Sequence, residues 1–304
     1  RRPYAIADVA SAYWYVDKDD SGKQFTLALD KAVSLYKTEK KYKRSINYVM
    51  SSAARRDPSL VKALAKRLAE QDKDGKVGMS GETALDLVDE DPELAAKIAE
   101  SFAPNGLNDG TAMFLIFGLA KHRIQLSDRV FNTYLNAVRA KESVPLEATV
   151  TLAGYAFGYT EYYSINRSGE YFGSSLKPIQ GLRANPALVE AFLNLAYGRI
   201  SAAIAARNNA AGDDMAARNF PILFALGYLL PEVARFSPAT MPAWQQLLAQ
   251  GNVGVLAPQT QAVQRILSQI HLNRERVRSF NDGSQDPEME AEASLENVEK
   301  LTGT

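Results

Sequence analysis

The sequence predicts an all-α protein, an α-solenoid in which antiparallel helical hairpins are stacked one after another. Apolar residues recur at three- and four-residue spacing along most of the chain, which is typical of helices with one buried face. Alternation of apolar and polar residues is nowhere sustained, so we expect no β-sheet. A helix-start pattern also returns at a period of about 34 residues, the length of one helix–turn–helix repeat.

The helix-start pattern is clearest at Asp57-Pro58. An aspartate can accept hydrogen bonds from the free amides of a first helical turn, and a proline at the first helical position loses no hydrogen bond. The apolar residues that follow form one stripe of Leu60, Leu64 and Leu68. This combination predicts a helix that begins at residue 58 and buries its leucines.

The pattern returns 34 residues later, at Asp91-Pro92. The equivalent stripe positions are Leu94, Ile98 and Phe102. A looser copy begins at Ser127, and its stripe is Val130, Tyr134 and Val138. Asn185-Pro186 opens a fourth segment of the same type. The common register favours a true repeat, although Asp-Pro is also an ordinary helix start.

Helices are expected in order along the whole chain. Those of the first half are expected at residues 5–16, 22–37, 40–54, 58–70, 81–90, 92–103, 110–121, 128–141 and 145–160. Those of the second half are expected at residues 186–209, 213–234, 240–250 and 257–272. Residues 273–294 have the composition of a flexible segment, and a short last helix is expected near 295–302.

An uneven distribution of charge divides the chain. The first 150 residues contain 44 charged side chains, whereas residues 151–272 contain only 14. We therefore expect charged helical repeats over 1–160, a Tyr- and Gly-rich irregular insertion over 161–185, charge-poor helical repeats over 186–272, and a flexible segment with a short terminal helix over 273–304. Charge-poor helix faces suit protein interfaces. A thicker, more buried half of the same stack is the alternative.

Three stretches, at residues 55–64, 87–95 and 127–131, resemble a group of uncharacterised bacterial helical-repeat proteins that are TPR-like in period. The similarity covers roughly residues 5–160 and continues more weakly to 270. Proteins of this group often carry signal peptides, so the resemblance implies a secreted or periplasmic location, with a cytoplasmic one as the alternative. It implies a fold and carries over no catalytic or binding residues.

One polar stretch has the spacing of a calcium-binding loop. Glu70, Asp72 and Asp74 supply carboxylates at alternate positions before Gly75, and Glu82 follows one residue later than the closing ligand of an EF-hand loop should. An ordinary polar turn between two helices has the same composition. Calcium is therefore a candidate at Glu70, Asp72, Asp74 and Glu82, and no other cofactor is expected.

No catalytic constellation is visible in the sequence. The chain has no cysteine, and its two histidines, His122 and His271, have no His or carboxylate neighbours at ligand spacing. Glycine-rich phosphate loops and the nucleophile and zinc motifs of hydrolases are absent from it. We expect a protein that is not an enzyme. An α/α-toroid that acts on carbohydrate is an alternative that rests on fold analogy alone.

A tyrosine-rich stretch is the strongest candidate for binding. Tyr162, Tyr163 and Tyr171 lie in a segment with Ser and Gly, a composition that offers rigid contact area at little entropic cost. We expect at least one of these rings in a protein interface. The alternative is that the rings fold back and cover the helices.

The overall composition limits the classes of partner that the chain can bind. Lys plus Arg and Asp plus Glu both total 35, so no net field attracts nucleic acid, and no apolar run reaches the length of a membrane span. We therefore expect a non-catalytic scaffold that binds a protein partner or copies of itself. A self-assembling subunit of an extracellular filament or tube is the main alternative, because solenoid ends stack on one another unless they are capped.

Overall fold

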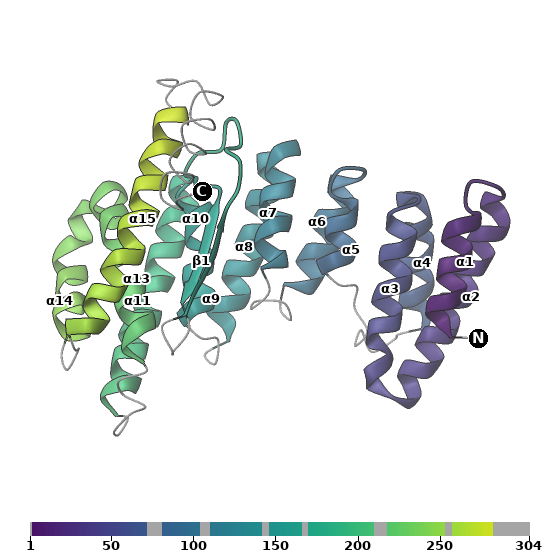
Figure 1. Cartoon of the computed structure of the whole chain (residues 1–304), viewed down its shortest axis with the longest axis horizontal. Coiled ribbons are helices and arrows are strands. Elements are labelled where there is room, and N and C mark those ends of the chain that lie inside the picture. Colours follow the sequence, from purple (N-terminus) through teal and green to yellow (C-terminus); the bar gives the residue numbers. More distant parts are fainter. Residues whose placement is uncertain are drawn as a thin grey trace, which may run out of the picture. The chain divides into compact units, whose positions relative to one another are not determined.

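A computed structural model describes residues 2–71, 81–103, 110–141, 146–165, 170–209, 218–252 and 257–281 of the chain. These residues are mostly helical, which confirms the all-α prediction (Figure 1). The chain divides into two compact units, Arg1–Glu142 and Ser143–Thr304, here called unit 1 and unit 2. The division lies before the boundary expected at residue 160, because the short helices after residue 145 pack with the second unit.

Unit 1 contains a series of helices joined by short connections. Their bounds are α1 (Pro3–Tyr13), α2 (Lys18–Thr38), α3 (Lys43–Ala54), α4 (Pro58–Gln71), α5 (Gly81–Leu87), α6 (Pro92–Phe102), α7 (Thr111–His122) and α8 (Ile124–Ala140), with a 3₁₀ turn, η1 (Lys40–Tyr42), before α3. Consecutive pairs pack together: α1 with α2, α3 with α4, α5 with α6, and α7 with α8. Each odd-numbered helix also contacts the next odd-numbered one: α1 contacts α3, α3 contacts α5, and α5 contacts α7. Among the even-numbered helices, α2 contacts α4 and α6 contacts α8.

The predicted helix starts are confirmed at three places. Helices begin at Pro58, Pro92 and Pro186. The preceding side chain accepts a backbone hydrogen bond each time: Asp57 from Ser59 at 2.7 Å, Asp91 from Leu94 at 3.0 Å, and Asn185 from Ala187 at 3.2 Å. Capping of this kind satisfies amides that have no partner within the helix.

The predicted stripes are buried at their central positions, and Leu68 and Val138 are also buried at the last position. Leu64 and Ile98, which occupy equivalent places in the pattern, are each 1% exposed. Leu60 and Leu94, at the first position, are only half-buried because they lie at the helix ends. Val130, Tyr134 and Val138 are fully buried on α8.

The expected start at Ser127 was wrong. Helix α8 begins at Ile124, and Ser127 lies inside it with no capping role. The Ser127 hydroxyl instead donates to the Ile116 carbonyl at 2.6 Å, so it ties α8 to α7. The helix expected at residues 22–37 begins earlier, at Lys18, because the Asp17 side chain caps α2 by accepting a hydrogen bond from the Asp20 amide at 2.9 Å.

Unit 2 combines helices with one β-hairpin. Its elements are α9 (Leu146–Thr151), α10 (Ala153–Ala156), β1 (Glu161–Ile165), β2 (Tyr171–Ser175), α11 (Pro186–Asn208), α13 (Asn219–Phe236), η2 (Pro238–Thr240), α14 (Met241–Gly251) and α15 (Ala257–Asn281). Helix α13 is central, because it packs against α9, α11, α14, α15 and β1. Its apolar run from Ile222 to Leu229 is almost entirely buried.

The expectation of no β-structure was wrong for the insertion. Strands β1 and β2 pair antiparallel, with Tyr163 opposite Gly173. A Cβ at Gly173 would lie 2.1 Å from the Tyr163 ring, so only glycine lets that ring cross the neighbouring strand. The aromatic residues that suggested an adaptable loop are therefore strand residues.

The flexible segment expected from residue 273 was also placed too early. Helix α15 continues to Asn281. The sequence there is charged and has few apolar residues, but Arg274 is only 2% exposed and is paired with two carboxylates. The short helix expected near 295–302 lies outside the described residues.

Helix α11 is long and apolar enough to cross a membrane by length and composition alone. Within its most apolar window, 44% of the residues are buried inside the protein. A core helix passes the same test, and the described residues contain no second helix of this kind, so the described chain is not a many-span membrane protein.

Because Leu64 and Ile98 are buried at equivalent places, we expect Leu64→Ala and Ile98→Ala to have similar effects. Each change should lower the free energy of unfolding by roughly 2–5 kcal/mol, through lost burial and the cavity left behind. Chemical denaturation measures both. The half-buried Leu60→Ala is the matched control and should lose less; losses below about 1 kcal/mol at both core sites would contradict the shared register.

Candidate functional site

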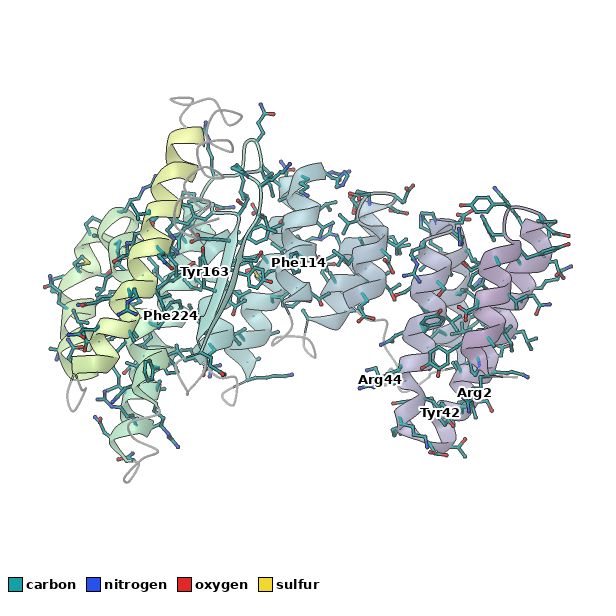
Figure 2. The ribbon with its side chains drawn as sticks, in the orientation of Figure 1. Arg2, Tyr42, Arg44, Phe114, Tyr163 and Phe224 are labelled. Atoms are coloured by element: carbon teal, nitrogen blue, oxygen red, sulfur yellow. The ribbon has the colours of Figure 1, made fainter. Side chains whose placement is uncertain are left out.

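Two of the three tyrosines expected in an interface, Tyr162 and Tyr163, are buried in the interior of unit 2. Tyr162 is 4% exposed and Tyr163 is 2% exposed. The Tyr163 ring meets the Tyr228 ring edge-on at 6.0 Å, and Tyr228 in turn stacks on Phe224 at 5.6 Å. Figure 2 labels Tyr163 on the hairpin and Phe224 on α13. The alternative of rings that cover the helices therefore describes these two residues. Tyr171 opens β2, and its side chain lies outside the described residues.

The calcium candidate cannot be assembled from described residues. Glu70 lies near the end of α4 and Glu82 in the first turn of α5, while Asp72 and Asp74 lie outside the described residues. Elsewhere in the described chain no group of three metal-ligating side chains is present. His122, on α7, hydrogen-bonds to the exposed Asp89 carboxylate at 2.8 Å, and His271 belongs to α15 in the other unit.

The described surface of unit 2 contains a groove of about 520 Å³, here called the α11–α14 groove. One face of α11 forms its first wall. The second wall comes from the end of α13, the turn η2 and the start of α14. The lining residues are Pro186, Val189, Glu190, Leu193, Asn194, Tyr197, Phe236, Ser237, Thr240, Ala243 and Trp244.

The floor of the groove is apolar and its rim is polar. Val189, Leu193 and Trp244 are buried at the floor. Glu190 and Asn194 are exposed on the α11 rim, and Glu190 is a neighbour of both Leu193 and Asn194 because residues three and four apart on a helix adjoin. Glu190 is the one charged residue among the lining residues, so the rim carries a local negative charge.

Both ends of α14 are fixed against α11, which holds the groove open. At the start of α14, the Trp244 ring meets the Tyr197 ring edge-on at 5.6 Å. At its end, the buried Arg207 guanidinium donates to the carbonyls of Gly251 at 2.6 Å and Gln250 at 2.9 Å. A cation at the carbonyl end of a helix is stabilised by the helix dipole. Burial lowers the pKa of Arg207, yet an arginine stays charged under ordinary conditions.

Beneath the hairpin lies a second feature, the Arg274 cluster, made of Arg274, Glu161, Glu232, Tyr159 and Tyr228. Arg274 pairs with Glu161 at 2.5 Å and with Glu232 at 3.1 Å, and all three side chains are almost fully buried. Tyr159 donates to Glu232 at 3.1 Å, and Tyr228 donates to Glu161 at 3.2 Å. The guanidinium also lies over the Tyr228 ring, 3.8 Å from its centre.

Electrostatics inside this cluster depend on the single arginine. Burial opposes charge on Arg274, but Tyr228 and the two carboxylates hold its pKa above the ordinary value. Burial raises the pKa of the Glu161 carboxyl, and Arg274 acts in the opposite direction. Burial likewise raises the pKa of Tyr228 well above its usual range, so its hydroxyl remains a neutral donor. One cation therefore serves two buried carboxyls, and no residue of the cluster lines the α11–α14 groove.

Sequence reasoning missed both features because each joins residues far apart in the chain. The groove brings α11 together with Trp244, and the cluster brings residue 161 together with residue 274. One local signal was present, since Leu193 and Tyr197 are an apolar pair at four-residue spacing.

Comparisons with protein-family models, with curated proteins and with solved structures found no match.

We expect Arg274→Met to lower the free energy of unfolding by about 3–5 kcal/mol, because it leaves two carboxyls buried without their cation. The effect should depend on pH. Without the arginine, burial raises the pKa of the Glu161 carboxyl in the folded state above the unfolded value. Stability is then lost as pH rises through the folded pKa, so the deficit should be larger at pH 8 than at pH 5.

Arg265→Met, an exposed change on the same helix, is the matched control and should be nearly neutral. Urea denaturation at both pH values measures the two variants. Equal, pH-independent losses for Arg274→Met and Arg265→Met would show that the cluster is unimportant for stability.

Proposed function

We propose that this chain is a non-catalytic helical-repeat scaffold that binds a protein partner in the α11–α14 groove. The observation that carries the proposal is the groove itself, an apolar floor with aromatic walls and a polar rim on a rigid pair of helices. Of the aromatic residues that line it, Tyr197 remains partly exposed, and tyrosine is among the residues that most often dominate protein interfaces. Clefts of this volume accommodate one or two side chains of a partner.

The helix arrangement of unit 1 supports the scaffold part of the proposal. Pairs of antiparallel helices that contact only their neighbours are the pattern of an α-solenoid with a TPR-like period. Ion pairs between side chains about 30 residues apart recur along it. They are Arg55 with Asp86, Lys62 with Asp91, Arg123 with Glu93, and Arg129 with Glu100. Exposed pairs contribute little stability each, but their recurrence is what stacked repeats predict.

The chemistry of the groove favours a peptide over a sugar. Carbohydrate binding uses the exposed face of an aromatic ring, whereas Trp244 is only 2% exposed and forms part of the floor. An apolar side chain can cover that floor, and the Asn194 amide on the rim can exchange hydrogen bonds with a peptide backbone. Glu190 favours a cationic residue beside it. The proposed ligand is therefore a segment with a large apolar residue next to Lys or Arg.

A catalytic role has less support. The described residues place no nucleophile, base and acid together in the groove, and its one carboxylate, Glu190, lies exposed on the rim. The two buried carboxyls of the Arg274 cluster are held by their arginine beneath the hairpin.

A peptide selection tests the proposal. The full chain with Trp14→Phe, which leaves Trp244 as the only tryptophan, is used to select binders from a random peptide library. We expect the enriched peptides to pair a large apolar residue with Lys or Arg and to change the Trp244 fluorescence. A library that yields no enriched sequence, or binders that leave this fluorescence unchanged, would contradict the groove as the binding site.

The matched variants are Ala243→Arg and Gln245→Arg. Ala243 lines the groove, whereas Gln245 is exposed on α14 and is not one of the lining residues. We expect Ala243→Arg to weaken binding by at least about tenfold, or about 1.4 kcal/mol, because the new side chain fills the groove. Gln245→Arg should bind as the parent does. Equal dissociation constants for the two variants would place the peptide elsewhere.

A further inference from the structure

A dense group of exposed cations, here called the basic turn, lies where α2 passes through η1 into α3. Its members are Lys37 in the last turn of α2, Lys40 and Lys41 in η1, and Lys43 and Arg44 at the start of α3. All five side chains are exposed. Glu39 is the one carboxylate among residues 37–44. Because the whole chain has no net charge, this turn is a local concentration of positive charge.

Ion pairing leaves most of this charge uncompensated. Glu39 pairs with Lys41, and none of the ion pairs in the described part of the chain uses the other four cations. Elsewhere in unit 1, exposed cations have carboxylate partners: Arg55 has Asp86, Lys62 has Asp91, Arg67 has Asp30, and Arg123 has Glu93. The basic turn is therefore available to an anionic partner.

Helix stability accounts for only part of the basic turn. Cations are favoured near the last turn of a helix by its dipole, so Lys37 suits the end of α2. Lys43 and Arg44 occupy the first turn of α3, where the same dipole disfavours positive charge. Helix α3 has neither an acidic residue in that turn nor a side-chain cap. A sequence that opposes its own local structure in this way is typical of a functional surface.

The basic turn projects beyond the neighbouring helices of unit 1. Near the end of α4, Arg67 and Gln71 both donate to Asp30, and α2 continues from there to Thr38, roughly 12 Å farther. At the start of α1, the Tyr4 ring contacts Tyr48 at 4.9 Å, so the first turn of α3 extends past α1. Figure 2 labels Tyr42 and Arg44 at this end of the helices.

We propose that the basic turn binds the surface of a membrane that contains anionic phospholipids. Groups of roughly four to eight Lys and Arg residues are typical of such contacts. Four of the five cations are lysines, which are flexible point charges suited to many phosphates spread over a surface. Tyr42 is partly exposed among them, and the Lys41 ammonium lies over its ring at 5.4 Å. A tyrosine with one polar end suits the headgroup level of a bilayer.

A flat anionic surface fits this arrangement better than a nucleic acid does. Nucleic-acid contacts follow the backbone over several phosphates, so they need cations along a face of the protein. Next to the basic turn, α2 and α4 instead carry the Asp30 and Glu70 carboxylates, which would repel the following phosphates. A flat surface meets only the projecting turn and leaves these carboxylates in water.

Cosedimentation of the full chain with vesicles tests the proposal. Vesicles of phosphatidylcholine with phosphatidylglycerol should carry the chain into the pellet at about 50 mM NaCl and release it at about 500 mM, because salt screens exposed charges. Vesicles of phosphatidylcholine alone should leave it in the supernatant. A chain that pellets equally with both kinds of vesicle, or with neither, would overturn the proposal.

A charge reversal identifies the surface. The double variant Lys43→Glu, Arg44→Glu should lower the partition coefficient by at least about tenfold. Its melting temperature should stay the same or rise, because acidic side chains suit the first turn of a helix. The matched control is Lys23→Glu, Lys97→Glu, the same change of charge at exposed positions of α2 and α6 away from the turn. The control should bind nearly as the parent does, and equal losses for the two double variants would refute the basic turn as the contact.

Substitutions of Arg44 alone separate a surface from a single phosphate site. Arg44→Lys should bind as the parent does and Arg44→Gln more weakly, because contact with a surface needs the charge and not the planar guanidinium. Equal losses for both would indicate bidentate binding of one phosphate and overturn the proposal. A parent chain that binds duplex RNA or polyglutamate, and not the anionic vesicles, would also overturn it. None of these outcomes affects peptide binding in the α11–α14 groove, which lies in unit 2.

Discussion

Arg274 joins three segments of unit 2 that are far apart in the sequence: the hairpin through Glu161, α13 through Glu232, and α15, on which it lies. A buried guanidinium is tolerated only where carboxylates and ring faces replace its water, and here two carboxylates and the Tyr228 ring do so. This requirement explains why α15 continues through a charged sequence, and why the hairpin lies against α13. Because α13 also packs on α11 and α14, the walls of the α11–α14 groove rest on the same helix.

Unit 1 is held together in a different way. Its helices bury small and aliphatic residues against their neighbours, and its ion pairs are partly exposed. Such pairs contribute little to the stability of the unit, because exposed charges are screened by water. They show mainly which helices lie next to one another. The stability of unit 1 therefore depends on burial that is spread along the chain, whereas that of unit 2 depends more on one cluster.

The local parts of this structure could be predicted from the sequence, and the non-local parts could not. Asp57-Pro58 and Asp91-Pro92 specify helix starts within a few residues, so their positions and the burial of Leu64 were predicted correctly. The hairpin was missed because its tyrosines were counted as loop residues, although Gly173 within an aromatic run indicated a strand crossed by a ring. Arg274 and Trp244 acquire their roles from partners dozens of residues away, which no spacing rule connects.

The shortage of charge in the second half has a structural explanation that changes where interfaces should be sought. Helix α13 is surrounded by other elements, and Tyr162 and Tyr163 are buried against the interior, so the missing charges reflect burial within the chain. Among the described residues, eight of the nine exposed large apolar side chains belong to unit 1 and only Leu272 belongs to unit 2. Four of those eight lie between Val9 and Val16. An exposed apolar surface is a stronger sign of association than a charge-poor composition, because contact between apolar side chains and water is unfavourable. The α11–α14 groove is therefore proposed from its lining residues and not from the scarcity of charge around it.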